Sequence, residues 1–147
     1  MDYKLLCAQL KALTEDVENE ISNLSNASAL LWQELSDINW AGFYKMEGGI
    51  LVLYPFQGKP ACTKISVGKG VRGPAVAQDK VQLVPDVHDF PGHIACDCAS
   101  NSEIVVPIHV NGEIWGVLDI DSPSLGRFTE EDREGLENFV KILETIL

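Results

Sequence analysis

The 147 residues carry 11 basic and 22 acidic side chains, a formal net charge of −11 at pH 7. Nucleic acids and anionic membranes are bound mostly through Lys and Arg, so this charge argues against both as partners. Hydrophobic residues make up 46% of the chain, and no apolar run is long enough to cross a bilayer. The length suits a single globular domain, residues 1–147, whose core needs no disulfide to stabilise it.

The chain starts with MDYKLLCAQL, which has acidic and amide residues where a secretory signal would be basic and then apolar. The sequence therefore predicts a cytoplasmic protein. In that compartment the four cysteines are expected to stay reduced more often than to form structural disulfides.

Residues 4–24 carry an apolar residue at every third or fourth position, which predicts one amphipathic helix. The members of this stripe are Leu6, Leu10, Leu13, Val17, Ile21 and Leu24. The polar stretch SNLSNAS (22–28) interrupts the stripe, and ASALLWQELSD (27–37) predicts a second, shorter helix.

Six segments rich in aromatic and β-branched residues predict strands. They cover residues 40–46, 50–57, 61–67, 81–87, 103–110 and 113–121. Two hairpins are expected, because Gly48-Gly49 permits the positive φ angles of a tight turn and Asn111-Gly112 is the strongest short hairpin signal. The glycine-rich GKGVRGPAVAQD (68–79) predicts a turn and a short helix, and it matches neither phosphate-binding glycine motif.

Residues 129–147 predict a C-terminal helix, which Thr129 can cap with Asp132 as its capping-box partner. Its apolar stripe consists of Leu136, Phe139, Val140, Leu143 and Ile146. The order of elements indicates an α+β domain, with a mostly antiparallel central sheet and the N- and C-terminal helices packed on one face.

The loop HDFPGHIACDCASNS concentrates unusual side chains. His93, Cys96 and Cys98, with Cys62, offer four zinc ligands, but structural zinc sites usually contain C-x₂₋₄-C pairs, which C-x-C does not match. A Cys96–Cys98 disulfide would be strained and easily reduced, so it would be redox-active rather than structural. Either thiol can also be a small buried side chain, which is the interpretation we adopt for Cys7.

Three carboxylates are expected to meet near this loop. Pairing across Asn111-Gly112 brings Glu103, at the start of one strand, beside the end of the next. Asp119 and Asp121 lie there, two residues apart and therefore on the same face. Acidic residues at the ends of strands are usually exposed to solvent. Yet LDID alternates apolar and acidic residues as a half-buried strand does, and clustered buried carboxyls raise one another's pKa and hold protons at neutral pH.

Several motifs resemble one known family in order and spacing along residues 40–128. They are WAGFY, LYPFQGKPAC, VPDV, FPGHIACD, ASNSEIVVPI and GVLDIDSP. Together they are similar to the free methionine-(R)-sulfoxide reductases. The resemblance implies a GAF-type fold and reduction of free methionine-R-sulfoxide with electrons from thioredoxin and NADPH. We also expect no bound cofactor or metal, and the sequence is compatible with a homodimer.

The resemblance assigns roles to individual residues. Cys96 in HIACD matches the nucleophile, and Cys62 in PAC matches the resolving cysteine. Trp40 and Tyr44 match the aromatic wall around the substrate's methyl group. The acidic cluster that binds and activates the sulfoxide matches Glu103, Asp119 and Asp121.

Two positions depart from the family. The family usually has a cysteine in GVCG, where this chain has Arg72 in GVRG, and it commonly has a small residue without a thiol where this chain has Cys98. A mechanism that needs the third cysteine cannot operate here, whereas a Cys96–Cys62 pair can. We expect Arg72 to be tolerated, either near the thiol or substrate, where its charge would help, or as a surface residue of the turn.

The chemistry agrees with these residue types. Sulfoxide sulfur becomes electrophilic when its oxygen is protonated, and a buried neutral carboxyl is a suitable donor. A thiolate then attacks the sulfur and becomes a sulfenic acid, which a second thiol converts to a disulfide. The alternative from another class is a GAF module that senses small ligands such as cyclic nucleotides. Under that alternative the thiol pair has no role, and few basic residues are present to meet a phosphate.

Overall fold

The computed structural model describes residues 1–67, 69–90 and 100–147. Six strands form one sheet in the order β3-β2-β1-β6-β5-β4, with every neighbouring pair antiparallel. The strands are β1 Trp40–Glu47, β2 Ile50–Gly58, β3 Lys64–Ser66, β4 Gln82–Val84, β5 Ser102–Val110 and β6 Glu113–Ser122. The helices are α1 Tyr3–Thr14, α2 Glu20–Glu34, α3 Arg72–Gln78 and α4 Glu130–Glu144, with a 3-10 turn at Val87–Asp89.

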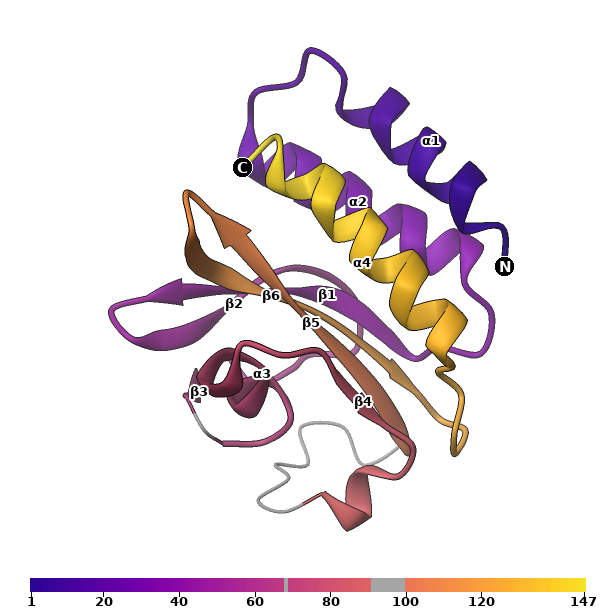
Figure 1. Cartoon of the computed structure of the whole chain (residues 1–147), viewed down its shortest axis with the longest axis vertical. Helices are drawn as coiled ribbons and strands as arrows, with labels where there is room; N and C mark the ends of the chain where they lie inside the picture. Colours follow the sequence, from indigo (N-terminus) through magenta and orange to yellow (C-terminus); the bar gives the residue numbers. More distant parts are fainter. Residues whose placement is uncertain (68, 91–99) are drawn as a thin grey trace.

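Helices α1, α2 and α4 lie together on one side of the sheet, and α3 lies on the other (Figure 1). The expected α+β class, with the terminal helices on one face, is therefore confirmed. Within the described ranges, no helix combines the length and the apolar composition that a membrane crossing requires.

Both faces of the central strands are buried, because each contributes to a different apolar cluster. Along β1, Ala41 and Phe43 pack toward the three helices, while Trp40 and Tyr44 belong to the cluster on the α3 side. Successive strand residues point to opposite faces, so the same alternation in β5 and β6 decides which side chains face α3. The acidic residues of those strands lie on that side.

The two predicted hairpins are present. Gly48 (φ 58°) and Gly49 (φ 81°) join β1 to β2, and Asn111 (φ 54°) and Gly112 (φ 79°) join β5 to β6. Both turns place two residues in the left-handed region, as a two-residue hairpin turn requires. The outer strands β3 and β4 are shorter than predicted, and Pro85, which cannot donate a ladder hydrogen bond, directly follows β4.

The predicted boundary between the first two helices was wrong. The break lies between Thr14 and Glu20, so that SNLSNAS lies inside α2. Asp16 takes a positive φ of 59°, and the Asn19 side chain caps α2 by accepting from the Ser22 amide. Inside α2, Asn23 donates to the Val17 carbonyl at 2.8 Å, which satisfies this buried amide.

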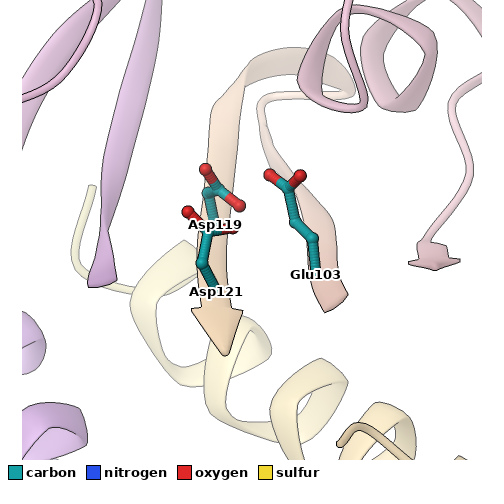
Figure 2. A group of neighbouring side chains, drawn as sticks. All are labelled: Glu103, Asp119 and Asp121. Atoms are coloured by element: carbon teal, nitrogen blue, oxygen red, sulfur yellow. The ribbon is translucent and has the colours of Figure 1, made fainter. Parts of the chain in front are cut away.

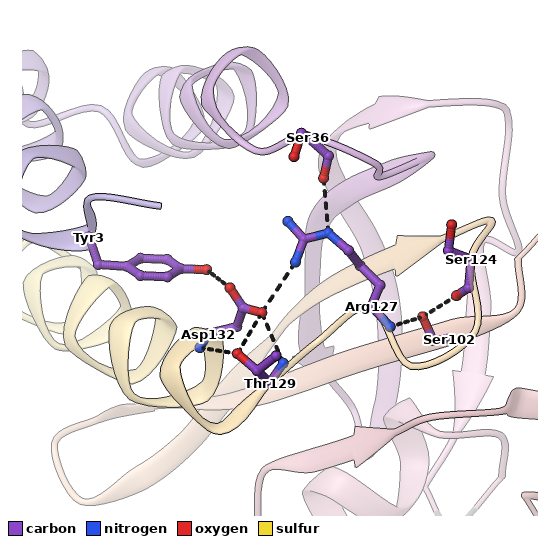
Figure 3. Close-up of polar contacts among 7 residues, drawn as sticks. All are labelled: Tyr3, Ser36, Ser102, Ser124, Arg127, Thr129 and Asp132. Carbon is purple, nitrogen blue, oxygen red and sulfur yellow. Dashed lines mark hydrogen bonds and ion pairs between the residues drawn. The ribbon is translucent and has the colours of Figure 1, made fainter.

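The capping box of α4 is confirmed, and it is part of a larger polar network (Figure 3). Asp132 accepts from the amide and hydroxyl of Thr129, from the Tyr3 hydroxyl at 2.6 Å and from Arg127 at 3.2 Å. Arg127 also donates to the Ser36 carbonyl. Burial opposes ionisation of Asp132, but the hydrogen bonds from Tyr3 and Thr129 hold its pKa below the ordinary value. The network connects the starts of α1 and α4 with the segment that follows α2.

Candidate active site

The β5–β6 hairpin brings three carboxyls together on the α3 side of the sheet (Figure 2). Glu103 of β5 lies opposite Asp121 of β6, and Asp119 precedes Asp121 by two residues on the same face. One oxygen from each of the three lies within 4.8 Å of the others. All are buried, with 4%, 0% and 4% of Glu103, Asp119 and Asp121 exposed. The structure thus places the predicted acids as the hairpin register requires.

Burial and the repulsion between neighbouring carboxylates raise the pKa of two members of this cluster, Glu103 and Asp121. Desolvation, followed by the negative charge of Asp119, raises the pKa of both Glu103 and Asp121 well above their ordinary values, and the positive charge of Arg72 opposes the shift. Glu103 Oε2, Asp119 Oδ1 and Asp121 Oδ1 receive no hydrogen bond from any described N–H or O–H group. These oxygens are therefore able to share protons or to accept a donor from a bound molecule.

Arg72 contacts the cluster directly. It is the first residue of α3, only 8% exposed, and its Nε donates to Asp119 Oδ2 at 2.5 Å. The same nitrogen lies 3.7 Å from Glu103 Oε2. The interpretation of Arg72 as a surface residue of the turn is therefore wrong. Local spacing in GVRG gives no signal for this contact, because it depends on how α3 crosses the sheet.

The two predicted aromatic residues lie beside the acids. Trp40 stacks on Tyr44 with ring centroids 5.8 Å apart and on Phe56 at 5.1 Å. The Arg72 guanidinium carbon lies 4.9 Å from the Tyr44 ring centroid and 6.0 Å from that of Trp40. Trp40 is also the register partner of Asp121 across β1 and β6. One guanidinium therefore contacts both the aromatic wall and the acid cluster, and Phe56 is an aromatic member that the sequence analysis missed.

Cys62 lies next to this wall. The Tyr44 hydroxyl donates to the Cys62 carbonyl at 2.9 Å, and the Trp40 indole N–H donates to the Lys59 carbonyl at 3.2 Å. These two bonds hold the segment between β2 and β3 against the aromatic pair. The Cys62 sulfur is disulfide-bonded, whereas Cys7 on α1 is a free thiol.

The remaining predicted sulfur residues fall outside the described part of the chain. Cys96 and Cys98 belong to residues 91–99, as does His93, so the Cys62–Cys96 pair stays a prediction and so does the zinc alternative. Three carboxylates as close as those of the acid cluster can also attract a cation. Here the guanidinium of Arg72 already supplies a positive charge to the cluster.

The fold and the site define this chain as a GAF domain, and the GAF domain family matches residues 9–147. YtsP of Bacillus subtilis is 57% identical over 148 residues, which cover 99% of this chain and 91% of that protein. The free methionine-R-sulfoxide reductase of Escherichia coli is 55% identical over 145 residues, covering 99% and 88% of the two chains. The reduced form of fRMsr from Staphylococcus aureus matches with a TM-score of 0.97 and 54% identity, covering 99% and 95%.

The resemblance carried by the motifs is thus confirmed over nearly the whole chain. This chain belongs to the free methionine-R-sulfoxide reductase family. Structures with bound substrate exist for the enzymes of Staphylococcus aureus and Neisseria meningitidis, which are 53% and 41% identical to this chain.

Proposed function

We propose that this protein reduces free methionine-R-sulfoxide to methionine. The observation that carries the proposal is a buried pair of carboxyls, Glu103 and Asp121, that face each other across the β5–β6 hairpin. Burial raises the pKa of both. They lie beside two stacked aromatic rings and a segment that contains a cysteine. A sulfoxide needs a proton on its oxygen, an apolar surface for its methyl group and a thiol for its sulfur, and the family membership indicates the same reaction.

The first step consumes one thiol. Glu103 or Asp121 donates a proton to the sulfoxide oxygen while the Cys96 sulfur attacks the sulfoxide sulfur. The sulfur–oxygen bond of the substrate breaks, methionine leaves with its sulfur reduced by two electrons, and Cys96 is oxidised to a sulfenic acid. Trp40 and Tyr44 contact the substrate's methyl group, and Asp119 attracts its ammonium group.

The second step restores the enzyme. Cys62 attacks the Cys96 sulfenic acid, water leaves with the oxygen, and a Cys62–Cys96 disulfide forms. A thioredoxin dithiol then reduces this disulfide by thiol exchange, and NADPH reduces thioredoxin in turn. A supply of reduced thioredoxin indicates the cytoplasm as the compartment. That the protein forms a homodimer also remains a prediction.

The test is an assay of the two sulfoxide epimers. With thioredoxin, thioredoxin reductase and NADPH, we expect the purified protein to consume NADPH when free methionine-R-sulfoxide is added, and not when the S epimer is added. Cys96→Ser should abolish turnover. Cys7→Ser, which removes a thiol from the opposite side of the sheet, should keep the parent rate. Equal turnover of both epimers, or of neither, would overturn the proposal.

A further inference from the structure

Arg72 discriminates among the three carboxyls of the acid cluster. Its Nε makes a 2.5 Å hydrogen bond to Asp119 and lies 3.7 Å from Glu103. Asp119 is also the one carboxyl of the three with no exposed surface. A buried carboxylate is stable only when a cation or hydrogen-bond donors compensate its charge. Of the three carboxyls, Asp119 is therefore the one whose negative charge Arg72 compensates most directly.

The cost of burying an uncompensated charge also limits how many of the three carboxyls can be ionised at once. Full ionisation would place three negative charges within 4.8 Å of one another against one guanidinium. Within residues 1–67, 69–90 and 100–147, Arg72 is the cation in contact with these buried carboxyls, so two of the charges would have no counter-ion among the described residues, which is costly. Glu103 and Asp121 face each other across the hairpin and each has an oxygen without a hydrogen-bond donor among the described residues. A proton shared between them relieves both problems.

In the part of the chain that the structure describes, the other titratable groups around the cluster come from three segments. Tyr44 projects from β1, Arg72 from α3, and Cys62 lies in the segment ahead of β3. Burial raises the pKa of Tyr44, against the opposing charge of Arg72, so this phenol stays neutral and adds no negative charge. The Cys62 sulfur is disulfide-bonded and does not titrate in this state. Among these described groups, Arg72 is the cation that decides where the charge lies.

We infer that Arg72 is a positioning residue for proton donation. Its ion pair holds Asp119 as the permanent anion of the site, and the proton destined for the sulfoxide oxygen thereby stays on the Glu103–Asp121 pair. In the reductive step this proton moves to the substrate's oxygen, which passes to Cys96 as the hydroxyl of the sulfenic acid and leaves as water only when Cys62 forms the disulfide. The pair takes a new proton from solvent. The inference rests on the proposed function for its purpose, but the distribution of charge that it assigns can be measured without substrate.

The first measurement uses the unaltered protein. Carbon-13 labels in the aspartate and glutamate carboxyls allow each group to be titrated by NMR, with Asp119→Asn, Asp121→Asn and Glu103→Gln assigning the signals. We expect Asp119 to ionise at least about one pH unit below the other two, a tenfold difference in proton affinity. If Asp119 titrates together with Glu103 and Asp121, or above them, the inference is overturned even if the enzyme is active.

The second measurement tests whether Arg72 is the cause of this difference in proton affinity. Arg72→Gln removes the cation, Arg72→Lys keeps it, and Lys69→Gln removes an equal charge from an exposed position three residues away. The pH profile of methionine release in a single turnover should shift its alkaline limb upward by about one unit or more in Arg72→Gln, because loss of the cation tightens proton binding by the pair. Arg72→Lys should stay near the parent, and Lys69→Gln should match it.

The outcomes separate the two proposals. Equal profiles for Arg72→Gln and Lys69→Gln would overturn the role of Arg72. If Arg72→Gln does not fold, the NMR titration of the parent still decides. If no form of the protein releases methionine while Asp119 titrates lowest, the proposed function fails and the assigned charge distribution holds.

Discussion

Cys62 is positioned through its backbone, because its carbonyl accepts the hydrogen bond from Tyr44. Substitution of the sulfur leaves that bond intact. We therefore expect Cys62→Ser to fold like the parent, to release about one methionine per site and then to stop at the Cys96 sulfenic acid, since no thiol resolves it. Rapid quenching with chromatographic measurement of methionine checks this result, and Cys7→Ser is the matched control.

Continued cycling of Cys62→Ser with thioredoxin would contradict the proposed pairing. Cys98 would then be the resolving thiol, and a protein with both Cys62→Ser and Cys98→Ser should stop after one turnover.

The buried acids are expected to act on the rate rather than on binding. Glu103→Gln and Asp121→Asn keep the size of each side chain but cannot deliver a proton. A general acid typically contributes 10²–10⁴-fold, so each variant should slow the single-turnover step by about 100-fold. Methionine affinity, measured by calorimetry, should change far less. The control is Glu113→Gln, an exposed glutamate at the start of β6. Weaker binding with an unchanged step would assign these carboxyls to ammonium recognition instead.

The acids and the arginine differ in how far the sequence predicts them. Glu103, Asp119 and Asp121 follow from strand alternation and from the register that a two-residue turn imposes, which are local properties. The position of Arg72 follows from the packing of α3 across β5 and β6, a contact between segments 47 residues apart in the case of Asp119. The local sequence GVRG therefore does not predict this contact.

Among the elements, capping residues decided the helix boundaries more than apolar spacing did. Leu13, Val17 and Ile21 continue the stripe of α1, but they are 41%, 38% and 47% exposed and do not join the core. The stripe therefore extends across a break that Asp16 and Asn19 impose. The C-terminal helix was predicted well because its stripe and its cap agree.

Helices α1 and α4 pack closely at Gly135. A Cβ on this residue would lie 2.1 Å from Cγ of the Tyr3 ring. Alanine normally favours a helix over glycine by about 1 kcal/mol, but here it displaces Tyr3 from its hydrogen bond to Asp132. We expect Gly135→Ala to lower the free energy of unfolding by about 1–3 kcal/mol, as measured by urea denaturation.

A double-mutant cycle controls for helix propensity. In a Tyr3→Ala background the ring is absent, so Gly135→Ala should become neutral or stabilising. A stabilising effect in the parent itself would show that the two helices separate without cost.

At the scale of the whole molecule, the acid cluster makes stability depend on pH. The pKa values of Glu103 and Asp121 are raised on folding. Their contribution to stability is therefore fully present below their unfolded pKa, about pH 4, and is lost as the pH rises through the folded pKa. We expect Glu103→Gln to be more stable than the parent at pH 8, with the advantage shrinking toward pH 4. Urea midpoints across this range measure it.

Two further groups, Asp119 and Asp132, are expected to change the pH dependence of stability in other ways. Asp119→Asn should be less stable than the parent at neutral pH, because it leaves the buried Arg72 without its closest anion. The lowered pKa of Asp132 acts in the opposite sense from the cluster, since its contribution is present above its ordinary pKa and disappears on acidification. An advantage of Glu103→Gln that is constant with pH would show that Glu103 does not titrate during unfolding.

The order of the sheet is the property of the whole molecule that local patterns predict least. Hairpin signals predict the pairs β1–β2 and β5–β6, and both are present. The pairing of β1 with β6 joins Trp40 to Asp121, segments separated by more than half of the chain, and no turn signal connects them. That pairing places the aromatic wall beside the acids, so the complete site forms only after β1 pairs with β6.

The division of the site between one hairpin and one short helix has a consequence for single substitutions. The three acids depend on a single register, because a one-residue slip of β6 against β5 would move Asp119 and Asp121 to the face opposite Glu103. The first residue of α3 reaches the same acids from outside the hairpin and can be exchanged by a single substitution that leaves the register untouched. A single substitution at Arg72 therefore changes the counter-charge of the acid cluster while the three carboxyls keep their positions.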